Sequence, residues 1–208
     1  MSLSHLRPRL LLAVLLSTLA GCSVLPEAEA LRVFLLPSQA AEPVAAPAAP
    51  VARSLRITTP QASRILASER IAVIPQGNQI SAYQGARWSD TAPVLLRDRL
   101  IEAFQRDGRL AEVSSEDANL PADLVLYSDL RAFQSEYRDG QPHAVIRLDA
   151  RLVDRHNRRT LGSRRFEASQ ASDGTAVEQV VEAFGQAGDA LSGEVLKWTL
   201  EHAREHLP

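Results

Sequence analysis

The stretch Ile146-Arg147-Leu148-Asp149-Ala150-Arg151-Leu152 alternates apolar and charged side chains without interruption. Successive side chains of a β-strand point to opposite faces of a sheet, so this alternation predicts a strand with one buried and one solvent-exposed face. The stretch from Ala122 to Tyr137 alternates in the same way until its phase changes near Phe133, which predicts a β-bulge. Asp139-Gly140 lies between the two stretches and is typical of a tight turn, so an antiparallel hairpin is expected here.

The chain after this hairpin is expected to continue as a third strand and a long helix. A turn at His156-Asn157 precedes the returning strand from Leu161 to Ala168, and a helix is expected from about Thr175 to Glu205. Apolar residues recur along that helix at three-four spacing: Val177, Val181, Phe184, Gly188, Leu191, Val195 and Trp198. This narrow stripe favours packing on the sheet, and contact with a second copy of the chain is the alternative.

The first half of the chain adds shorter apolar runs and one amphipathic helix. Strands are expected at 31–36, 54–59, 70–75 and 78–83. The helix is expected to begin after Ser89 or Asp90 and to end near Asp107, with Pro93 in its first turn and Gly108 as its C-terminal cap. Together these elements predict an α+β fold: a single domain with a largely antiparallel sheet packed against two helices on one face.

The start of the chain has the layout of an export signal. Arg7 and Arg9 precede a short apolar run, Leu10–Leu16, and small residues lead to Leu19-Ala20-Gly21-Cys22. The run is shorter than the roughly 20 apolar residues that a membrane-spanning helix needs. Leu-Ala-Gly-Cys resembles the bacterial lipobox, in which the cysteine receives a diacylglycerol and becomes the new N-terminus. An ordinary signal peptide with an incidental cysteine is the alternative.

This interpretation divides the chain into a lipoprotein signal peptide (1–21), a lipidated tether (22–30) and a folded domain (31–208), with an Ala/Pro-rich loop or linker at 37–53. Cys22 is the only cysteine, so its diacylglycerol and N-acyl lipid would leave no thiol for an intrachain disulfide. No other cofactor is expected. Ser23, in place of the aspartate that usually retains such proteins at the inner membrane, indicates the periplasmic face of the outer membrane in a Gram-negative envelope.

The charge balance argues against a nucleic-acid partner. The chain has 23 Lys and Arg against 25 Asp and Glu, a net charge of −2. Removal of 1–21 takes away Arg7 and Arg9 and makes the net charge −4. Proteins that bind nucleic acid usually carry a basic surface instead.

The sequence offers no convincing catalytic constellation, with neither a Gly-x-Ser-x-Gly elbow nor a glycine-rich phosphate loop. The stretch His202–His206 matches the His-x-x-Glu-His zinc pattern, and two histidines four residues apart on a helix can share a metal. The third ligand would have to come from Glu178, Glu182 or His143. Because the motif lies at the end of a helix, an exposed polar terminus is the favoured interpretation, with no catalytic residue and no metal.

Five arginines gather around the turn at His156-Asn157: Arg155, Arg158, Arg159, Arg164 and Arg165. Lipid phosphates or an acidic partner protein would suit such a group. The favoured interpretation is a solvated hairpin tip that is partly neutralised by Asp154 and Glu167.

Two regions are candidates for binding a partner protein. One is the aromatic region from Tyr83 through Arg87 and Trp88, which precedes the first helix. The other is the end of the final helix around Trp198. Both tryptophans are also expected to be at least partly buried, because aromatic side chains dominate small cores.

The ordered set of these features resembles the ABC-type transport auxiliary lipoproteins. The resemblance rests on order and spacing over nearly the whole mature chain and is carried by Cys22, Phe34–Pro37, Leu55–Pro60, Ile65-Leu66, Asn78–Ile80, Arg87–Asp90, Leu96–Phe104, 122–168 and the final helix. The Arg87-Trp88 pair before an amphipathic helix is the most family-like detail. The chain departs from the family pattern at Gln61-Ala62, where members often carry Tyr-Leu.

The resemblance implies a non-enzymatic outer-membrane lipoprotein that docks onto an MCE-type ABC transport system, for intermembrane lipid transport and envelope integrity. Its implied partner is a periplasm-spanning MCE-domain protein, and self-association into a homo-oligomer is a further expectation. A stand-alone lipid or ligand carrier is the first alternative, and it would need a large apolar cavity between sheet and helices. A metallohydrolase that uses His202 and His206 is the second.

Overall fold

The computed structural model describes residues 30–38 and 50–205 of the chain. The expected signal peptide (1–21), Cys22 and nearly all of the tether lie outside the described residues, as does most of the predicted 37–53 linker. From Leu31 onward the chain forms one compact unit.

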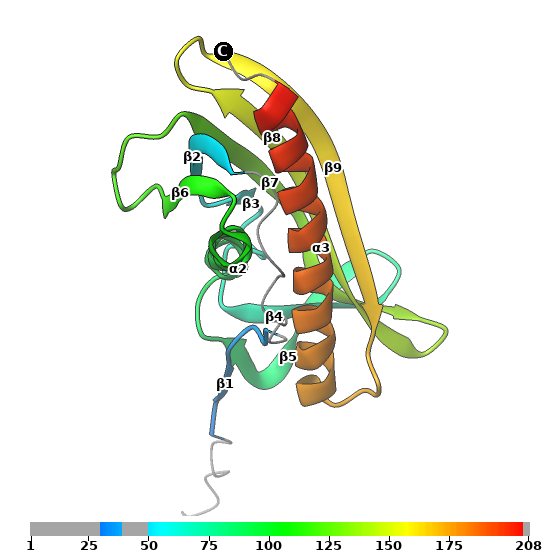
Figure 1. Ribbon diagram of the computed structural model, residues 1–208. Helices are drawn as coiled ribbons and strands as arrows, with labels where there is room; N and C mark the ends of the chain where they lie inside the picture. The colour runs from blue at the N-terminus through cyan, green and yellow to red at the C-terminus, as the bar shows by residue number, and fades with distance from the viewer. Residues whose placement is uncertain (1–29, 39–49, 206–208) are drawn as a thin grey trace, which may run out of the picture. The chain divides into compact units, whose positions relative to one another are not determined.

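The described residues of this unit form one mixed sheet with two helices on one of its faces (Figure 1). The elements are β1 (Arg32–Phe34), β2 (Val51–Ile57), β3 (Gln61–Ala62), β4 (Arg70–Gln76), β5 (Gln79–Trp88), α2 (Ala92–Asp107), β6 (Leu110–Ser115), β7 (Leu124–Arg138), β8 (Gln141–Asp154), β9 (Arg159–Ala171) and α3 (Val177–Glu205). The α+β class and the two covering helices are confirmed.

The longest antiparallel part of the sheet is the meander β7–β8–β9. The β7–β8 ladder is continuous apart from one register shift between Leu130 and Ala132, which is the bulge expected near Phe133. The turn residues Asp139 and Gly140 both have positive φ, 51° and 80°, as a two-residue type I′ turn requires. The hairpin that the alternating stretch predicted is therefore confirmed.

The other edge of β7 pairs with three strands in succession, all parallel to it. β2 pairs with residues 124–126, β3 with 129–130 and β4 with 134–136. One strand of 15 residues therefore joins three short strands that follow one another in the chain. β2 also pairs in parallel with β6, and β5 continues the sheet as the antiparallel partner of β4. The sheet is antiparallel in its long ladders and parallel where the N-terminal strands join.

Several strand boundaries differ from the expectations, and two strands were not expected. β1 is limited to Arg32–Phe34 within the predicted 31–36, because Pro37 follows and only these residues pair with β5. β2 begins at Val51 rather than at residue 54, so the last residues of the predicted 37–53 linker belong to the sheet. β3 and β6 were not expected, because short runs of mixed polarity carry little periodic signal. β5 extends to Trp88, five residues beyond its predicted end.

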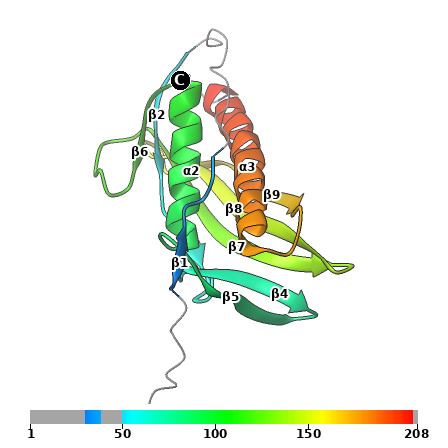
Figure 2. The same ribbon diagram turned by 90° about the horizontal axis from the view of Figure 1, so that it is seen from below.

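The two helices lie side by side on the sheet (Figure 2). α2 is preceded by Thr91 as its N-cap, and not by Ser89 or Asp90 as expected, because Pro93 occupies its first turn. The helix ends at Gly108, whose φ of 70° is the left-handed conformation expected of a C-terminal cap.

α3 buries a wider face than the predicted narrow stripe. The seven predicted positions are buried, and so are Val180, Ala183 and Ala187 between them. The extra width arises because α3 packs against β8, β9 and α2 together. This face is therefore not open to a second copy of the chain, and the oligomeric state itself stays a prediction.

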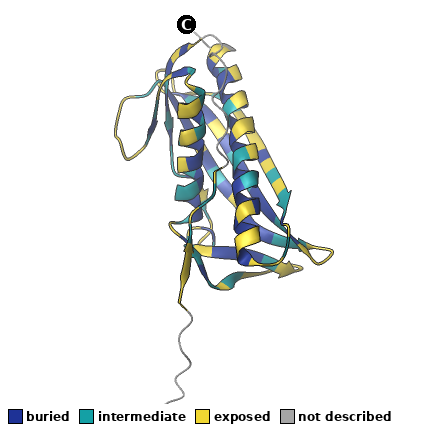
Figure 3. Cartoon of the chain, turned by 60° about the horizontal axis from the view of Figure 1, so that its bottom comes forward, coloured by how far each residue is buried: buried dark blue, intermediate teal, exposed yellow. Residues whose placement is uncertain are grey.

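Aromatic side chains fill the space between the sheet and the helices. Trp88, Phe133 and Phe184 are at most 1% exposed, and the Phe184 ring centroid lies 5.3 Å from that of Trp88 and 4.9 Å from that of Phe133. A second contact joins Phe166 of β9 to Trp198 of α3 at 5.5 Å. Figure 3 shows the buried positions along the sides of the helices that face the sheet. Both tryptophans are buried, as expected.

Candidate interaction surface

The segment Leu31–Ser38 follows the predicted tether and lies against the fold, and we call it the N-terminal strap. Its first part is β1, an edge strand that pairs in parallel with β5. Ser89 N donates a hydrogen bond to Phe34 O (2.8 Å) at the end of this ladder. The side chains of Phe34 and Leu36 pack against the core. The strap is therefore part of the folded domain.

A buried arginine on α2 holds the strap in place. Arg99 is 5% exposed and donates hydrogen bonds to the backbone carbonyls of Leu36 (2.9 Å) and Pro37. The same guanidinium forms an ion pair with Asp189 of α3. A buried arginine is costly unless its donors are paired, and here the two carbonyls and the carboxylate supply the partners. The Arg99 guanidinium of α2 thus contacts both the strap and α3.

A glycine on α3 makes room for the strap, which runs between α2 and α3 (Figure 2). A Cβ atom at Gly185 would lie 2.8 Å from the carbonyl oxygen of Pro37, closer than real Cβ atoms approach an oxygen. At Gly188 a Cβ atom would meet the Leu36 side chain at 3.8 Å, an ordinary contact distance. The close approach of α3 to the strap therefore depends on Gly185.

The outer side of the strap is apolar and exposed. Leu31, Val33 and Leu35 are 54%, 52% and 74% exposed, and we call these three side chains the apolar ridge. Of the residues between them, Phe34 packs on the core, whereas Arg32 is itself exposed and forms a surface ion pair with Glu178 at the start of α3. The alternation of a strand thus places three apolar side chains in solvent.

A surface groove of about 620 Å³ lies beside the ridge and is lined by Leu31, 68–70 and 81–87. Two sequence candidates, Tyr83 and Arg87, contribute to it. The Tyr83 hydroxyl donates to Ser135 Oγ (3.2 Å), and burial raises the pKa of Tyr83 to about 12, so the phenol stays neutral. Arg87 forms an ion pair with Glu69 (2.5 Å). The groove is thus an open surface feature whose lining combines apolar side chains with Tyr83, Arg87 and Glu69.

The two tryptophans that were candidates for partner contact are core residues. Trp88 is 0% exposed and Trp198 is 5% exposed. Trp88 packs against Phe184, and Trp198 packs against Phe166. Neither indole presents a surface to a partner, because the burial of large aromatic area stabilises this fold more than a solvent-facing position would.

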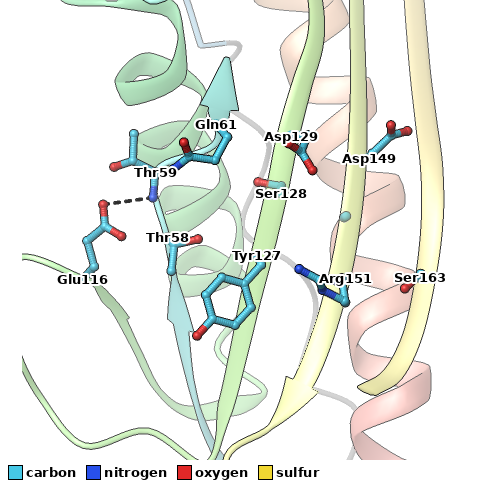
Figure 4. A pocket seen from close by; sticks show the side chains of 11 residues that line it. Thr58, Thr59, Gln61, Glu116, Tyr127, Ser128, Asp129, Asp149, Arg151 and Ser163 are labelled. Carbon is cyan, nitrogen blue, oxygen red and sulfur yellow. Dashed lines mark hydrogen bonds between the residues drawn. The ribbon is translucent and has the colours of Figure 1, made fainter. Parts of the chain in front are cut away.

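A second groove, of about 530 Å³, lies on the open face of the sheet (Figure 4). Tyr127 of β7 and Arg151 of β8 are neighbours in the ladder and both line it. Hydrogen bonds from Arg165 and then Arg131 lower the pKa of Asp149, at its edge, to about 2. Because this carboxylate is ionised and shared between two arginines, it is poorly suited to general acid–base catalysis.

The histidine motif does not assemble a metal site in the described part of the chain. His202 Nδ1 lies 2.9 Å from the carbonyl oxygen of Trp198, and the His202 ring packs on the indole. Glu178 and Glu182 lie about 36 and 30 Å away along the same helix, at 1.5 Å per residue. His206 lies outside the described residues. Within residues 30–38 and 50–205, no three His, Cys, Asp or Glu side chains come together as a metal site.

The arginines around the β8–β9 turn do not form one patch. Arg164 lies over the Phe166 ring (4.8 Å) and near Glu194 of α3 (3.5 Å). Arg165 points to the open face of the sheet and donates to Asp149 (2.6 Å). Strand alternation sends these two neighbours to opposite faces.

The acids that were expected to neutralise this turn have their ion-pair partners across the sheet. Asp154 forms a buried ion pair with Arg53 of β2 (2.5 Å), and Glu167 pairs with Arg147 (2.8 Å). Asp154 also accepts a hydrogen bond from the backbone of His156 in the turn (2.9 Å), and Glu167 interacts electrostatically with Arg165, so the partial neutralisation of the turn stays a prediction. The turn itself is an exposed basic tip, with Arg155, Arg158 and Arg159.

The sequence that forms this fold matches a known protein family. A profile of the family described as the ABC-type transport auxiliary lipoprotein component matches residues 34–195. The chain belongs to this family. The auxiliary-lipoprotein match begins inside the strap and ends within α3. Neither α2 nor α3 combines the length and the hydropathy that a transmembrane helix requires.

Two solved structures and one curated protein are similar to this chain. Protein XCC0632 from Xanthomonas campestris is 30% identical with a TM-score of 0.76, over 83% of this chain and 97% of that one. CT253 from Chlamydia trachomatis shares the fold at 10% identity and a TM-score of 0.54, over 74% and 99% of the two chains. An uncharacterized protein from Bradyrhizobium diazoefficiens is 32% identical over 148 residues, 71% of this chain. The chain spans 39% of that relative's length.

The contact of Arg99 with the strap, which we call the Arg99 clamp, was not predicted from the sequence. Arg99 lies in an amphipathic helix, where an arginine is expected on the solvent side. The contact that buries it comes from residues 36 and 37, far away in the chain. The one local signal was the pair Gly185 and Gly188 on one side of α3, because small residues permit close backbone approach.

Proposed function

We propose that this protein is an outer-membrane lipoprotein, anchored through an acylated Cys22, that docks a periplasm-spanning MCE-domain protein for intermembrane lipid transport. Membership of the ABC-type transport auxiliary lipoprotein family supports a role beside a transporter. The observation that carries the docking role is the clamped strap. Because Arg99 fixes Leu36 and Pro37 to both helices, the strap that follows the tether is part of the folded domain, so a lipid at Cys22 would keep the whole domain within reach of the membrane.

A stand-alone lipid carrier has less support. A carrier needs an enclosed apolar cavity, and the space between sheet and helices is where this fold would form one. That space holds the stacked rings of Phe133 and Phe184 with Trp88 against them. The grooves at Tyr83 and Tyr127 are open at the surface and not enclosed, and polar side chains contribute to the lining of both. These observations favour a binding surface over a carrier cavity.

The anchor is tested in the full-length chain. Cys22→Ser should abolish incorporation of labelled palmitate and release the protein from the outer-membrane fraction, because no other thiol can accept the lipid. Ser23→Ala is the matched control, since it keeps the thiol and should keep both properties. Palmitate labelling of the Cys22→Ser chain would refute the anchor.

The docking role is tested with the lipidated protein and an MCE-domain protein from the same organism. The two should co-purify in mild detergent, whereas an unrelated outer-membrane lipoprotein should not retain the MCE-domain protein. A chain that never binds this partner but co-purifies with stoichiometric phospholipid would replace the docking role with the carrier role.

A further inference from the structure

We propose that the apolar ridge is a membrane contact: Leu31, Val33 and Leu35 rest in the interfacial layer of the bilayer that holds the Cys22 lipid. The inference rests on the lipid attachment at Cys22 that is proposed above. It adds an orientation to that proposal, since it states which surface of the domain faces the membrane.

The ridge concentrates exposed apolar surface in one place. Its three side chains lie within five residues of chain and are 52–74% exposed. The other large hydrophobic side chains exposed in the described residues are less exposed, at 39–44%, and are separate in sequence: Ile80, Leu120 and Tyr127. Single exposed apolar residues are ordinary, whereas a cluster indicates a contact.

The fold does not require apolar residues at the ridge. The other positions of the strap carry its contacts to the domain: Phe34 packs on the core, the carbonyl of Leu36 accepts a hydrogen bond from Arg99, and Arg32 forms a solvent-exposed ion pair with Glu178. The outward positions of an edge strand are usually polar or charged, because an apolar edge invites aggregation. Leucine and valine at these positions are therefore explained by something outside the domain.

The length of the tether places the ridge at the membrane. Eight residues lie between Cys22 and Leu31, so the nine steps from one Cα to the next reach at most about 32 Å when the chain is fully extended. The acyl chains on Cys22 would thus keep the ridge at high local concentration beside the bilayer, where even a weak apolar contact becomes populated.

Contact with a second copy of the chain explains the ridge less well than contact with a bilayer does. A stable interface between two proteins buries about 800 Å² on each partner. Three partly exposed side chains supply only a small part of that area. A bilayer requires no matching surface, and the adjoining groove is lined by the exposed Arg70 beside the Arg87–Glu69 ion pair, a net positive charge that suits lipid phosphates.

The orientation directs the basic tip away from the membrane. Arg32 contacts Glu178 at one end of α3, whereas Gly162 of the β8–β9 hairpin faces His202 near the other end. These helix positions are about 36 Å apart at 1.5 Å per residue. Figure 1 shows β1 and the β8–β9 turn at opposite ends of the fold. With the ridge on the bilayer, the turn at Arg158 points into the periplasm.

The test places a nitroxide on the ridge of the full-length lipidated protein, reconstituted into vesicles of phosphatidylethanolamine and phosphatidylglycerol. Val33→Cys and Leu35→Cys each add one free thiol, because the sulfur of an acylated Cys22 cannot react. Leu120→Cys is the matched control, an exposed apolar position in the β6–β7 connection. We expect a ratio of oxygen to water-soluble nickel accessibility several-fold higher at positions 33 and 35 than at position 120.

Each outcome has one meaning. Ridge labels that the nickel complex reaches as readily as position 120 would overturn the membrane contact. Ridge labels that are shielded from both oxygen and nickel would also overturn it, because the cover would then be protein, either a second copy or another segment of the chain. Nitroxide uptake by the unsubstituted chain would instead show a free Cys22 and refute the lipid attachment itself.

Discussion

The meander β7–β8–β9 has two faces that come from alternate residues of the same strands and differ in their contacts. On the face under the helices, Ile146, Leu148 and Leu152 are 0% exposed. On the open face, Arg147 donates two hydrogen bonds to Glu167 (2.8 and 2.9 Å), and both side chains reach solvent. Burial under the helices gives the fold its stability. The open face pairs its own charges, which keeps it soluble without creating a strong field of one sign.

The largest expected effect lies under the helices. Phe184→Ala should lower the free energy of unfolding by about 3–5 kcal/mol, because it removes a buried ring that contacts both Trp88 and Phe133. Chemical denaturation of the purified protein measures the change. Phe184→Leu is the control and should cost less than half as much. A loss below about 1 kcal/mol for the alanine variant would show that the covered face is not the tightly packed one.

An intermediate effect on stability is expected where the strap passes between the helices. Replacement by alanine should lower stability at one glycine of α3 and raise it at another. Gly185→Ala should lower stability by about 1–3 kcal/mol, because its Cβ would meet the Pro37 carbonyl at 2.8 Å. Gly193→Ala is the matched control: nothing lies within 4 Å of its Cβ position, so better helix propensity should raise stability by about 0.5–1 kcal/mol. Thermal unfolding of both variants measures the difference, and a shift of the same sign in both would contradict the close contact.

The smallest effect is expected on the open face. Hydrogen bonds from Arg165 and Arg131 lower the pKa of Asp149 to about 2. Its folded-state pKa lies below its unfolded value, so its stabilising contribution is present above about pH 4 and is lost as the pH falls toward 2. Asp149→Asn should cost less than about 1 kcal/mol at neutral pH, since its partners are solvent-exposed.

Denaturation curves at several pH values test this last expectation. The difference between the unsubstituted chain and Asp149→Asn should shrink between pH 5 and pH 2. Glu182→Gln is the control for loss of a carboxylate at neutral pH, since Glu182 is exposed and the described residues show no ion pair for it, and it should leave the stability at pH 7 unchanged. A cost of several kcal/mol for Asp149→Asn would make the open face a structural element as important as the covered one.

Local patterns predicted the parts of the fold whose contacts are local. The alternation around Ile146 and the Asp139-Gly140 turn determine the β7–β8 hairpin, and both signals lie within the element they form. The helices were predicted for the same reason, from spacing and from Gly108. The parallel pairing of β2, β3 and β4 with β7 was not predicted, because it joins residues far apart in the chain and no short-range pattern encodes it.

The candidate site was predicted in part. Tyr83 and Arg87 do line a surface groove, since polar tips on partly apolar side chains favour such positions. Trp88 and Trp198 are buried instead, because a sequence position near a helix end does not report which way a side chain points. Cys22 lies outside the described residues and stays a prediction. The Arg99 clamp depends on tertiary contacts that only the fold reveals.

The long edge of β7 also dictates the order in which this chain can assemble. The three strands that pair along that edge precede β7 in the sequence, so a chain that emerges N-terminus first exposes β2, β3 and β4 before their common partner exists. Pairings between distant segments form slowly, and unpaired strands are prone to aggregate while they wait. The residues after 124, in contrast, can close their own hairpins as they appear. The strands of the first half can therefore complete their pairing only after β7, in the second half, has formed.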